Sequence, residues 1–275
     1  MHLGRARLAW AVPLLALTLT ACGAPERPQL STSASTQPGP PTTAPATPPA
    51  GADPSTPAAV TDPPPAEPVV QQGTVVARAN VSELTAYTDP DESSEPVATL
   101  PNPNANGGDL VLRVLTPASD VDGPWLEVML PVRPNGSTGW IRSDQVDLSI
   151  NPYRLEIDAS DFSLTVYEED ELLMSTTIAV GTGDTPTPFG EFYLAELLQP
   201  PNPNGSYGPY AFGLSGFSEV LDSFNGGDGV VGIHGTNDPS ALGTTVSHGC
   251  IRVANDVISD MATTVPLGTP VLITQ

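Results

Sequence analysis

Proline is concentrated in one stretch of the chain and limits what that stretch can become. Residues 25–68 contain 14 prolines, and no aromatic residue occurs between Gly23 and Ala86. Proline supplies no backbone N–H to a helix or sheet, and a segment without large apolar side chains cannot bury a core. We therefore expect residues 22–72 to be a disordered, partly polyproline linker. It is either a spacer that lifts the folded part off a membrane or low-complexity sequence with no length requirement.

The start of the chain is typical of an export signal. Arg5 and Arg7 precede an apolar stretch, Leu8–Leu19, that is too short to cross a bilayer as a helix. The sequence Leu19-Thr20-Ala21-Cys22 resembles a bacterial lipobox, in which the cysteine receives a lipid and becomes the mature N-terminus. We expect residues 1–21 to be a lipoprotein signal peptide and Cys22 to anchor an exported protein at the outer face of the cell membrane. An ordinary signal peptide is the alternative.

The charge balance narrows the possible partners. Acidic residues outnumber basic ones by 31 to 9, and the formal net charge at pH 7 is −22. Nucleic acid and anionic lipid surfaces repel such a chain. We therefore expect no nucleic-acid partner, and membrane contact only through the lipid anchor.

Residues 73–149 predict a small β-barrel. Short apolar runs are separated by turn sequences rich in proline, asparagine and glycine. The segments Trp125–Val128 and Gly139–Arg142, with a turn at Asn135-Gly136, resemble the second half of a bacterial SH3-like domain. Trp125 and Trp140 are then either the barrel core or a platform for cell-wall peptides. The predicted strands are Thr74–Ala79, Leu110–Leu115, Trp125–Leu130 and Gly139–Val146.

Residues 150–275 predict a second β-rich domain with a single short helix. The helix is expected to begin with Asn255 as its cap, to bury Val257, Ile258 and Met261, and to end before Pro266. With 25 glycines and 33 prolines, the whole chain is unsuited to a single helical domain. The fold class is thus mainly β. The predicted strands are Tyr153–Ile157, Ser163–Tyr167, Leu172–Val180, Phe189–Leu198 and Thr269–Thr274.

The residues capable of chemistry are concentrated near the C-terminus. Once Cys22 carries a lipid, Cys250 is the one free thiol, and His234 and His248 lie within 17 residues of it. An imidazole that takes the proton of a thiol makes it a good nucleophile, and either histidine could serve. Gly249 permits a tight turn in which backbone N–H groups converge, as stabilisation of an oxyanion requires.

These residues resemble the signature of the YkuD-type L,D-transpeptidases. The matching segments are His234–Thr236 and Ser247–Arg252, with further similarity at Ala179–Gly181 and Thr185–Gly190. The resemblance implies a β-sandwich catalytic domain over residues 150–275. It makes Cys250 the nucleophile and His234 the general base, with the Gly235 carbonyl orienting the imidazole. The backbone N–H groups of His248, Gly249 and Cys250 would form the oxyanion hole.

The resemblance also implies a reaction and a set of partners. Cys250 would attack the carbonyl of the third residue of a peptidoglycan stem, release the terminal D-alanine and pass the acyl group to a side-chain amine of a neighbouring stem, giving a 3→3 cross-link. The enzyme would reach into the cell wall, need no cofactor and react with carbapenem-type β-lactams. Ser247 and Arg252 would bind substrate. Gln199–Gly229 is either a lid over the thiol or a surface excursion, and its substrate-binding candidates are Tyr207, Tyr210 and Phe212.

Four alternatives need to be weighed. Water as the acceptor would make the protein an L,D-carboxypeptidase, and a silent site would leave a wall-binding lipoprotein without catalysis. A zinc site built on His234, His248 and Cys250 lacks a fourth histidine or cysteine, so we expect no metal. Papain-like peptidases are disfavoured because their cysteine precedes their histidine.

Overall fold

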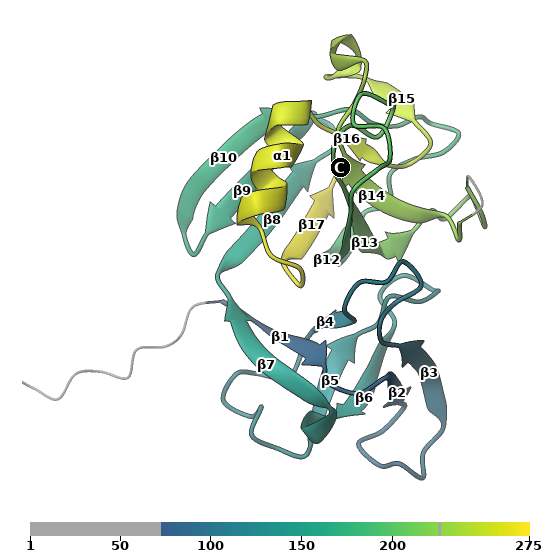
Figure 1. The fold of residues 1–275 in the computed structure, drawn as a ribbon, viewed down its shortest axis with the longest axis vertical. Helices are drawn as coiled ribbons and strands as arrows, with labels where there is room; N and C mark the ends of the chain where they lie inside the picture. Colours follow the sequence, from purple (N-terminus) through teal and green to yellow (C-terminus); the bar gives the residue numbers. More distant parts are fainter. Residues whose placement is uncertain (1–72, 225–226) are drawn as a thin grey trace, which may run out of the picture. The chain divides into compact units, whose positions relative to one another are not determined.

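The computed structural model describes residues 73–224 and 227–275 (Figure 1). All of them lie in one compact unit, residues 64–275. The expected signal peptide, Cys22 and the proline-rich linker lie outside the described residues. Within the described part of the chain, no helix is long and apolar enough to cross a membrane. The prediction of a mainly β fold with one short α-helix is confirmed.

The N-terminal module, residues 73–149 by the predicted boundary, consists of two small sheets. Their strand orders are β4-β1-β7 and β3-β2-β6-β5. Buried positions alternate along β2 and β6, as the period of a half-buried strand requires, and the core is mainly aliphatic. The strands are β1 (Thr74–Ala79), β2 (Glu83–Tyr87), β3 (Pro96–Pro101), β4 (Val111–Arg113), β5 (Trp125–Met129), β6 (Thr138–Arg142) and β7 (Val146–Asn151).

Trp125 and Trp140 lie outside that core. Both are half-buried, whereas their neighbours Leu126 and Ile141 are fully buried. The Trp125 ring packs edge-on against Tyr87, with ring centroids 5.8 Å apart. The two tryptophans therefore do not form the core of this module.

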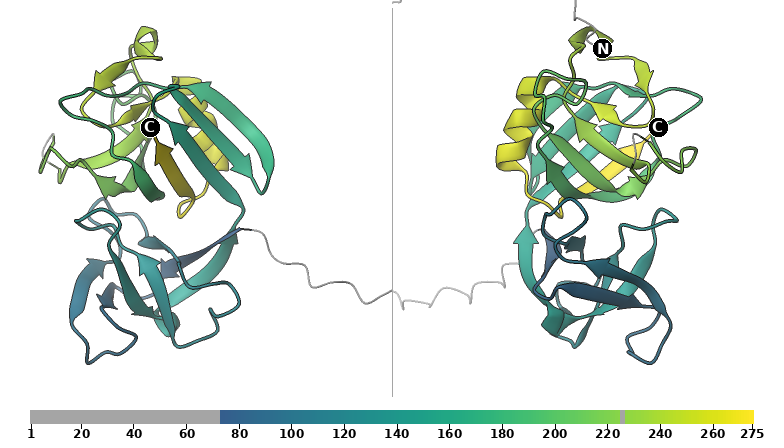
Figure 2. Two further views of the ribbon diagram at one scale, coloured as in Figure 1. Left: turned by 180° about the vertical axis from the view of Figure 1, so that it is seen from behind. Right: turned by 45° about the vertical axis from the view of Figure 1, so that its right-hand side comes forward.

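The C-terminal module is built on one eight-stranded sheet of order β10-β9-β8-β17-β12-β13-β14-β16, beside the two-stranded sheet β11-β15. Helix α1 (Asn255–Thr264) lies on one face of the large sheet (Figure 2) and buries Ile258 and Met261 in its core, as predicted, whereas Val257 is only partly buried against that core. The strands are β8 (Tyr153–Asp158), β9 (Ser163–Glu168), β10 (Glu171–Thr177), β11 (Val180–Gly181), β12 (Gly190–Leu198), β13 (Ala211–Phe217), β14 (Val230–His234), β15 (Thr245–Ser247), β16 (Ile251–Arg252) and β17 (Pro270–Thr274).

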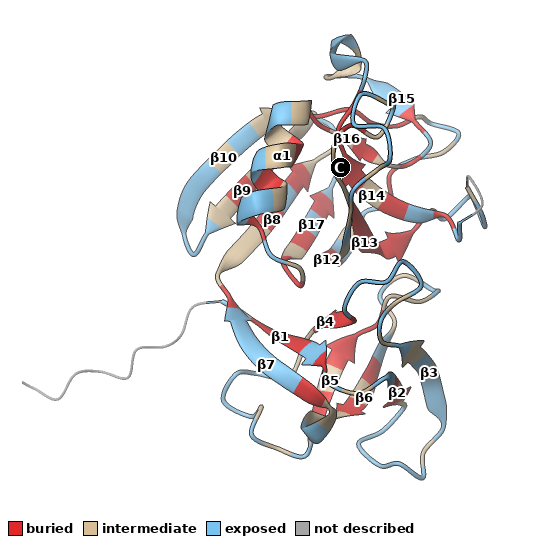
Figure 3. Ribbon diagram, in the orientation of Figure 1, coloured by how far each residue is buried: buried red, intermediate tan, exposed pale blue. Residues whose placement is uncertain are grey.

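One parallel strand pair brings the two sequence motifs together. In the register of β14 and β16, Ile233 is opposite Ile251 and His234 is opposite Arg252. Ile233 and Ile251 are fully buried, so the apolar sequence on each strand fixes the register. Figure 3 shows the buried positions of the sheet in red. The end of β14 and the turn before β16 consequently meet at the edge of the sheet.

The two modules share apolar packing. Tyr193, on β12 of the C-terminal module, is fully buried in the core cluster of the N-terminal module. Asn151 at the end of β7 is also buried, and its side-chain amide donates a 2.9 Å hydrogen bond to the Thr269 hydroxyl. The two modules therefore pack directly against each other at β12 and at the end of β7.

Candidate active site

His234 ends strand β14 and is nearly fully buried. Its Nδ1 lies 2.6 Å from the carbonyl oxygen of Gly235. A carbonyl oxygen can only accept a hydrogen bond, so Nδ1 carries the proton and the lone pair is on Nε2. The orientation of the imidazole by the Gly235 carbonyl, which the resemblance implied, is thus present in the structure.

The turn that carries Cys250 is held by two buried hydroxyl groups. The Ser247 hydroxyl donates to the Cys250 carbonyl at 2.5 Å and accepts the Gly249 N–H at 3.1 Å. The Thr187 hydroxyl donates to the Gly249 carbonyl at 2.9 Å and accepts the Gly181 N–H at the same distance. Gly249 has a φ of 115°, which residues with a side chain rarely adopt. These contacts fix the backbone on the N-terminal side of the thiol.

Two expectations for this turn need correction. The Gly249 N–H is already bonded to Ser247, so it is not free to join an oxyanion hole. Within the described part of the chain, the N–H groups of His248 and Cys250 make no hydrogen bond and are the remaining donors. Ser247 was expected to bind substrate, but its hydroxyl is committed to two backbone partners and its residue is buried.

His234 and Cys250 line one cavity of about 560 Å³, whose wall includes Gly232. Burial lowers the pKa of the His234 imidazole to about 4, and the charge of Arg252 acts in the same direction. Burial also raises the pKa of the Cys250 thiol, against smaller lowering effects from the Gly232 backbone and Arg252. The resting pair is therefore a neutral thiol beside a neutral imidazole, in contrast to the lowered thiol pKa expected from the sequence.

The other predicted substrate-binding residues occupy different surroundings. The Tyr207 ring lies against the His234 imidazole, with centroids 4.7 Å apart. Tyr210 packs against the main core, and Phe212 is fully buried in it, although Phe212 also forms part of the cavity wall. Arg252 lines a smaller hollow of about 90 Å³ beside Cys250, and its buried Nε has no hydrogen-bond partner in the described part of the chain.

Asn255 was predicted to cap helix α1, but it is the first helical residue, and Ala254 occupies the cap position. The side-chain oxygen of Asn255 accepts the Thr236 N–H at 2.8 Å. The amide therefore holds the turn that follows His234. Asparagine is a common cap residue, so the sequence did not indicate that this side chain would bind the Thr236 backbone instead.

The N-terminal module holds the segment that precedes β14. The Arg133 guanidinium donates to the carbonyls of Ser218, Leu221 and Asp228 at 2.8, 3.0 and 3.0 Å. It also lies over the Phe217 ring, 4.8 Å from its centroid.

Asn135 adds two more contacts to the same segment. Its side-chain amide donates to the Phe217 carbonyl at 2.9 Å and accepts the Phe217 N–H at 2.8 Å. Further along, the Phe224 ring stacks on His248 with centroids 5.2 Å apart. The sequence predicts only a turn at Asn135-Gly136. It does not indicate the clamp that Arg133 and Asn135 form on the segment before β14.

No group of three or more metal-ligating side chains occurs among residues 73–224 and 227–275.

Known proteins match the C-terminal module. The YkuD family, described as an L,D-transpeptidase catalytic domain, matches residues 152–273. The YkuD protein of Bacillus licheniformis is 41% identical over 123 residues, which cover 45% of this chain and 66% of that protein. The YkuD protein of Bacillus subtilis is 36% identical over 124 residues, which cover 45% and 67%. The matches thus span about two thirds of the length of each relative.

A solved L,D-transpeptidase from Mycobacterium smegmatis is 17% identical, covers 60% of this chain and 82% of its own, and has a TM-score of 0.39. The Bacillus relatives define the class. The chain belongs to the YkuD-type L,D-transpeptidase family.

Proposed function

We propose that this protein is a peptidoglycan L,D-transpeptidase that works through a thioester on Cys250. The observation that supports it best is the placement of His234 and Cys250 on one cavity within a YkuD-type domain, with the imidazole tautomer set by the Gly235 carbonyl. A neutral imidazole with a free Nε2 can accept a proton, which is what a general base for a thiol must do.

In the first half-reaction, Nε2 of His234 takes the thiol proton as Sγ of Cys250 attacks the carbonyl carbon of the third stem residue. The oxyanion accepts hydrogen bonds from the N–H groups of Cys250 and His248. The bond to the terminal D-alanine then breaks, and the imidazolium gives its proton to the departing amine. The product is a thioester that links the shortened stem to Cys250.

In the second half-reaction, a side-chain amine on the third residue of a neighbouring stem attacks the thioester. His234 accepts a proton from that amine and returns it to the departing thiolate. The new amide is a 3→3 cross-link, and the enzyme is restored. Water in place of the amine gives L,D-carboxypeptidase activity.

Arg252 suits the carboxylate of the terminal D-alanine. Its guanidinium lines the small hollow beside Cys250 and His248, and its Nε lacks a partner in the described residues. An arginine binds a carboxylate through charge-assisted hydrogen bonds. Tyr207, packed on His234, would border the same substrate.

A carbapenem-type β-lactam is the inhibitor that this mechanism implies. Its strained amide acylates a thiol in the same way as the stem carbonyl does, and the ring-opened product stays attached to Cys250. Incubation of the protein with a carbapenem should therefore add the intact mass of the drug to the wild-type chain and not to Cys250→Ala.

Anchoring through a lipidated Cys22 would place the enzyme at the outer face of the cell membrane, within reach of the wall. The lipobox and the proline-rich linker support it. The expressed protein should partition into detergent and carry a diacylglyceryl mass on Cys22. Recovery of Cys22→Ser in the same membrane fraction would contradict the anchor.

The reaction is tested with the full-length protein and a disaccharide tetrapeptide. Mass analysis should find a cross-linked dimer that has lost one D-alanine, and Cys250→Ala should form none. Tripeptide without a dimer would identify a carboxypeptidase instead. The absence of both products would overturn the proposed function.

A further inference from the structure

The cavity of Cys250 continues across three neighbouring strands. Glu196 on β12 is opposite Gly213 on β13, and Gly213 is opposite Gly232 on β14. The parallel register of β14 and β16 places Gly232 beside Cys250. Residues opposite one another on neighbouring strands share a face, and all four line the cavity. Glu196 is thus the ionisable group at the far end of a row that starts at the thiol.

Gly213 lets the Glu196 side chain lie across the neighbouring strand. A Cβ atom at Gly213 would be 2.7 Å from Oε1 of Glu196, so the carboxylate occupies the space above that glycine. Two strand spacings separate β13 from β16. The carboxylate is therefore on the order of 10 Å from the thiol along the cavity floor.

The N-terminal module holds this carboxylate from the other side. The side-chain amide of Asn106 donates to Oε2 of Glu196 at 2.8 Å. The Oε1 atom has no hydrogen-bond partner, and no arginine pairs with Glu196, among the described residues. The carboxylate therefore has one oxygen placed by Asn106 and one oxygen available to a ligand.

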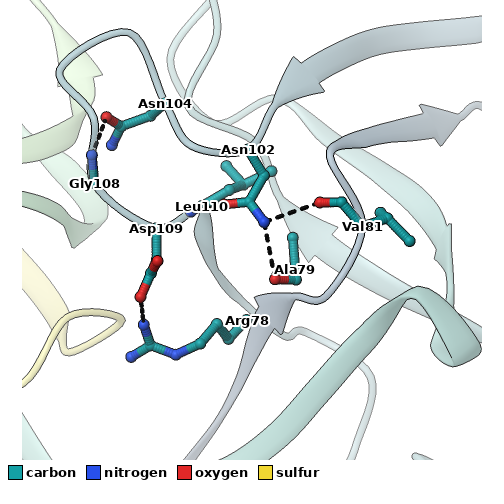
Figure 4. Close-up of polar contacts among 8 residues, drawn as sticks. All are labelled: Arg78, Ala79, Val81, Asn102, Asn104, Gly108, Asp109 and Leu110. Atoms are coloured by element: carbon teal, nitrogen blue, oxygen red, sulfur yellow. Dashed lines mark hydrogen bonds and ion pairs between the residues drawn. The ribbon is translucent and has the colours of Figure 1, made fainter.

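The loop that carries Asn106 is itself well supported. The Asn102 amide donates to the carbonyls of Ala79 and Val81 at 3.0 and 2.9 Å, and its oxygen accepts the Leu110 N–H at 3.0 Å (Figure 4). The Asn104 oxygen accepts the N–H of Gly108 at 3.0 Å. Asn106 is thus presented from a loop that is tied to the end of β1 and to the turn that follows it.

We propose that Glu196 binds the side-chain ammonium of the third residue of the donor stem. The inference rests on the proposed function, because a 3→3 cross-link requires a third residue with a side-chain amine, and donor and acceptor are stems of the same polymer. Glu196 is then a specificity-determining residue that distinguishes diamino acids from uncharged residues at this position. The N-terminal module contributes to that specificity through Asn106.

The dimensions agree with such a ligand. An extended side chain of four or five carbons places its amine about 7 Å from the carbonyl carbon of the same residue. A hydrogen bond from ammonium to carboxylate adds about 3 Å. The sum matches the separation of about 10 Å along the row from Cys250 to the carboxylate.

The test uses the full-length protein and two tetrapeptides that differ only at the side-chain amine of the third residue, free in one and acetylated in the other. The readout is the rate of D-alanine release with no added acceptor, expressed as kcat/KM. For the wild type, acetylation should lower this value about tenfold to a hundredfold, the range for loss of a hydrogen bond between charged groups. Glu196→Gln should lower the value for the free amine by a similar factor and leave the acetylated peptide unchanged.

Two controls complete the design. Glu171→Gln removes an exposed carboxylate from the same module outside the cavity and should leave both peptides unaffected. Alkylation of Cys250 by iodoacetamide should proceed equally in all three proteins. Equal kcat/KM values for the two peptides with the wild type would overturn the role of Glu196. A decrease of kcat/KM by the same factor for both peptides in Glu196→Gln would also overturn it. Failure of the wild type to release D-alanine from either peptide would overturn the proposed function, and this inference with it.

Discussion

At His234, burial and one carbonyl decide the protonation state. The Gly235 oxygen requires a hydrogen on Nδ1, and burial disfavours a second proton on Nε2 because a charged ring would be poorly solvated. The same burial disfavours the thiolate of Cys250. In the proposed mechanism, proton transfer from Cys250 to His234 therefore accompanies attack on the substrate, where the charge that develops on the carbonyl oxygen is stabilised.

The pH dependence of acylation follows from this state. In the proposed mechanism the base is active when His234 is neutral, and the pKa of about 4 keeps the imidazole neutral throughout the physiological range. The acylation rate should stay level as the pH falls from 7 to 5 and decline only as the pH passes through about 4. Stopped-flow acylation by a carbapenem, with folding monitored at each pH, measures this. A midpoint near 6.5 would show that the imidazole titrates as if exposed.

The two histidines should differ when each is replaced by alanine. His234→Ala removes the base and the proton donor to the leaving amine, so acylation should fall nearly as far as in Cys250→Ala. His248→Ala keeps its backbone N–H and loses the stacking with Phe224, so a smaller loss is expected. Mass spectrometry of folded variants gives the rates. An inactive His248→Ala beside an active His234→Ala would reverse the assigned roles.

Among the structural elements, those that a local sequence pattern indicates could be predicted. Strands β8 and β9 follow the alternation of apolar residues, and the His-Gly-Thr and Ser-His-Gly-Cys segments identify the candidate site. Strand β13 was not predicted, because it is buried almost throughout and lies within Gln199–Gly229, which was expected to be a lid or a surface excursion. The supports of that site come from distant parts of the chain. Thr187 and Asn255 hold the two turns through side chains that have many common uses in loops and caps. Their partners became visible only with the strand order.

Arg133 is another support of the site that could not be predicted from the sequence. Its three carbonyl partners lie more than 80 residues away in the sequence, between Ser218 and Asp228. No local pattern distinguishes such an arginine from an exposed one. The loop before β6 nevertheless holds the segment whose Phe224 stacks on His248.

Removal of the Arg133 guanidinium should loosen this segment. In Arg133→Ala, three carbonyl partners lose charge-assisted hydrogen bonds, and we expect acylation to slow about tenfold with a loss of about 1–2 kcal/mol in the free energy of unfolding. Arg78→Ala, in the same module, is the matched control, since Arg78 pairs with Asp109 on the surface. Acylation rates and urea unfolding separate the two effects. Unchanged acylation in Arg133→Ala would show that the clamp is irrelevant to the site.

For the whole molecule, the modules are coupled by shared packing. Tyr193 of the C-terminal module is buried in the N-terminal core, and its hydroxyl has no hydrogen-bond partner within residues 73–224 and 227–275. Burial correspondingly raises the pKa of the phenol. The ring contributes to stability through packing, whereas the unpaired hydroxyl opposes it.

Tyr193→Phe should consequently stabilise the protein. The substitution keeps the ring and removes a buried hydroxyl without a partner, so the free energy of unfolding should rise by about 1 kcal/mol. Urea unfolding of the full-length chain measures it, with the half-buried Tyr167 replaced by phenylalanine as a comparison. A loss of stability in Tyr193→Phe would mean that the hydroxyl has a partner.

The most direct test of the mechanism is to find the atom that carries the acyl group. The full-length protein is mixed with tetrapeptide stem, quenched in acid within the first turnover, digested and sequenced by mass spectrometry. We predict a peptide containing Cys250 with an added mass equal to the stem without its terminal D-alanine, bound as a hydroxylamine-sensitive thioester. D-alanine release by Cys250→Ala at the wild-type rate, or an acyl group on any other residue, would contradict it.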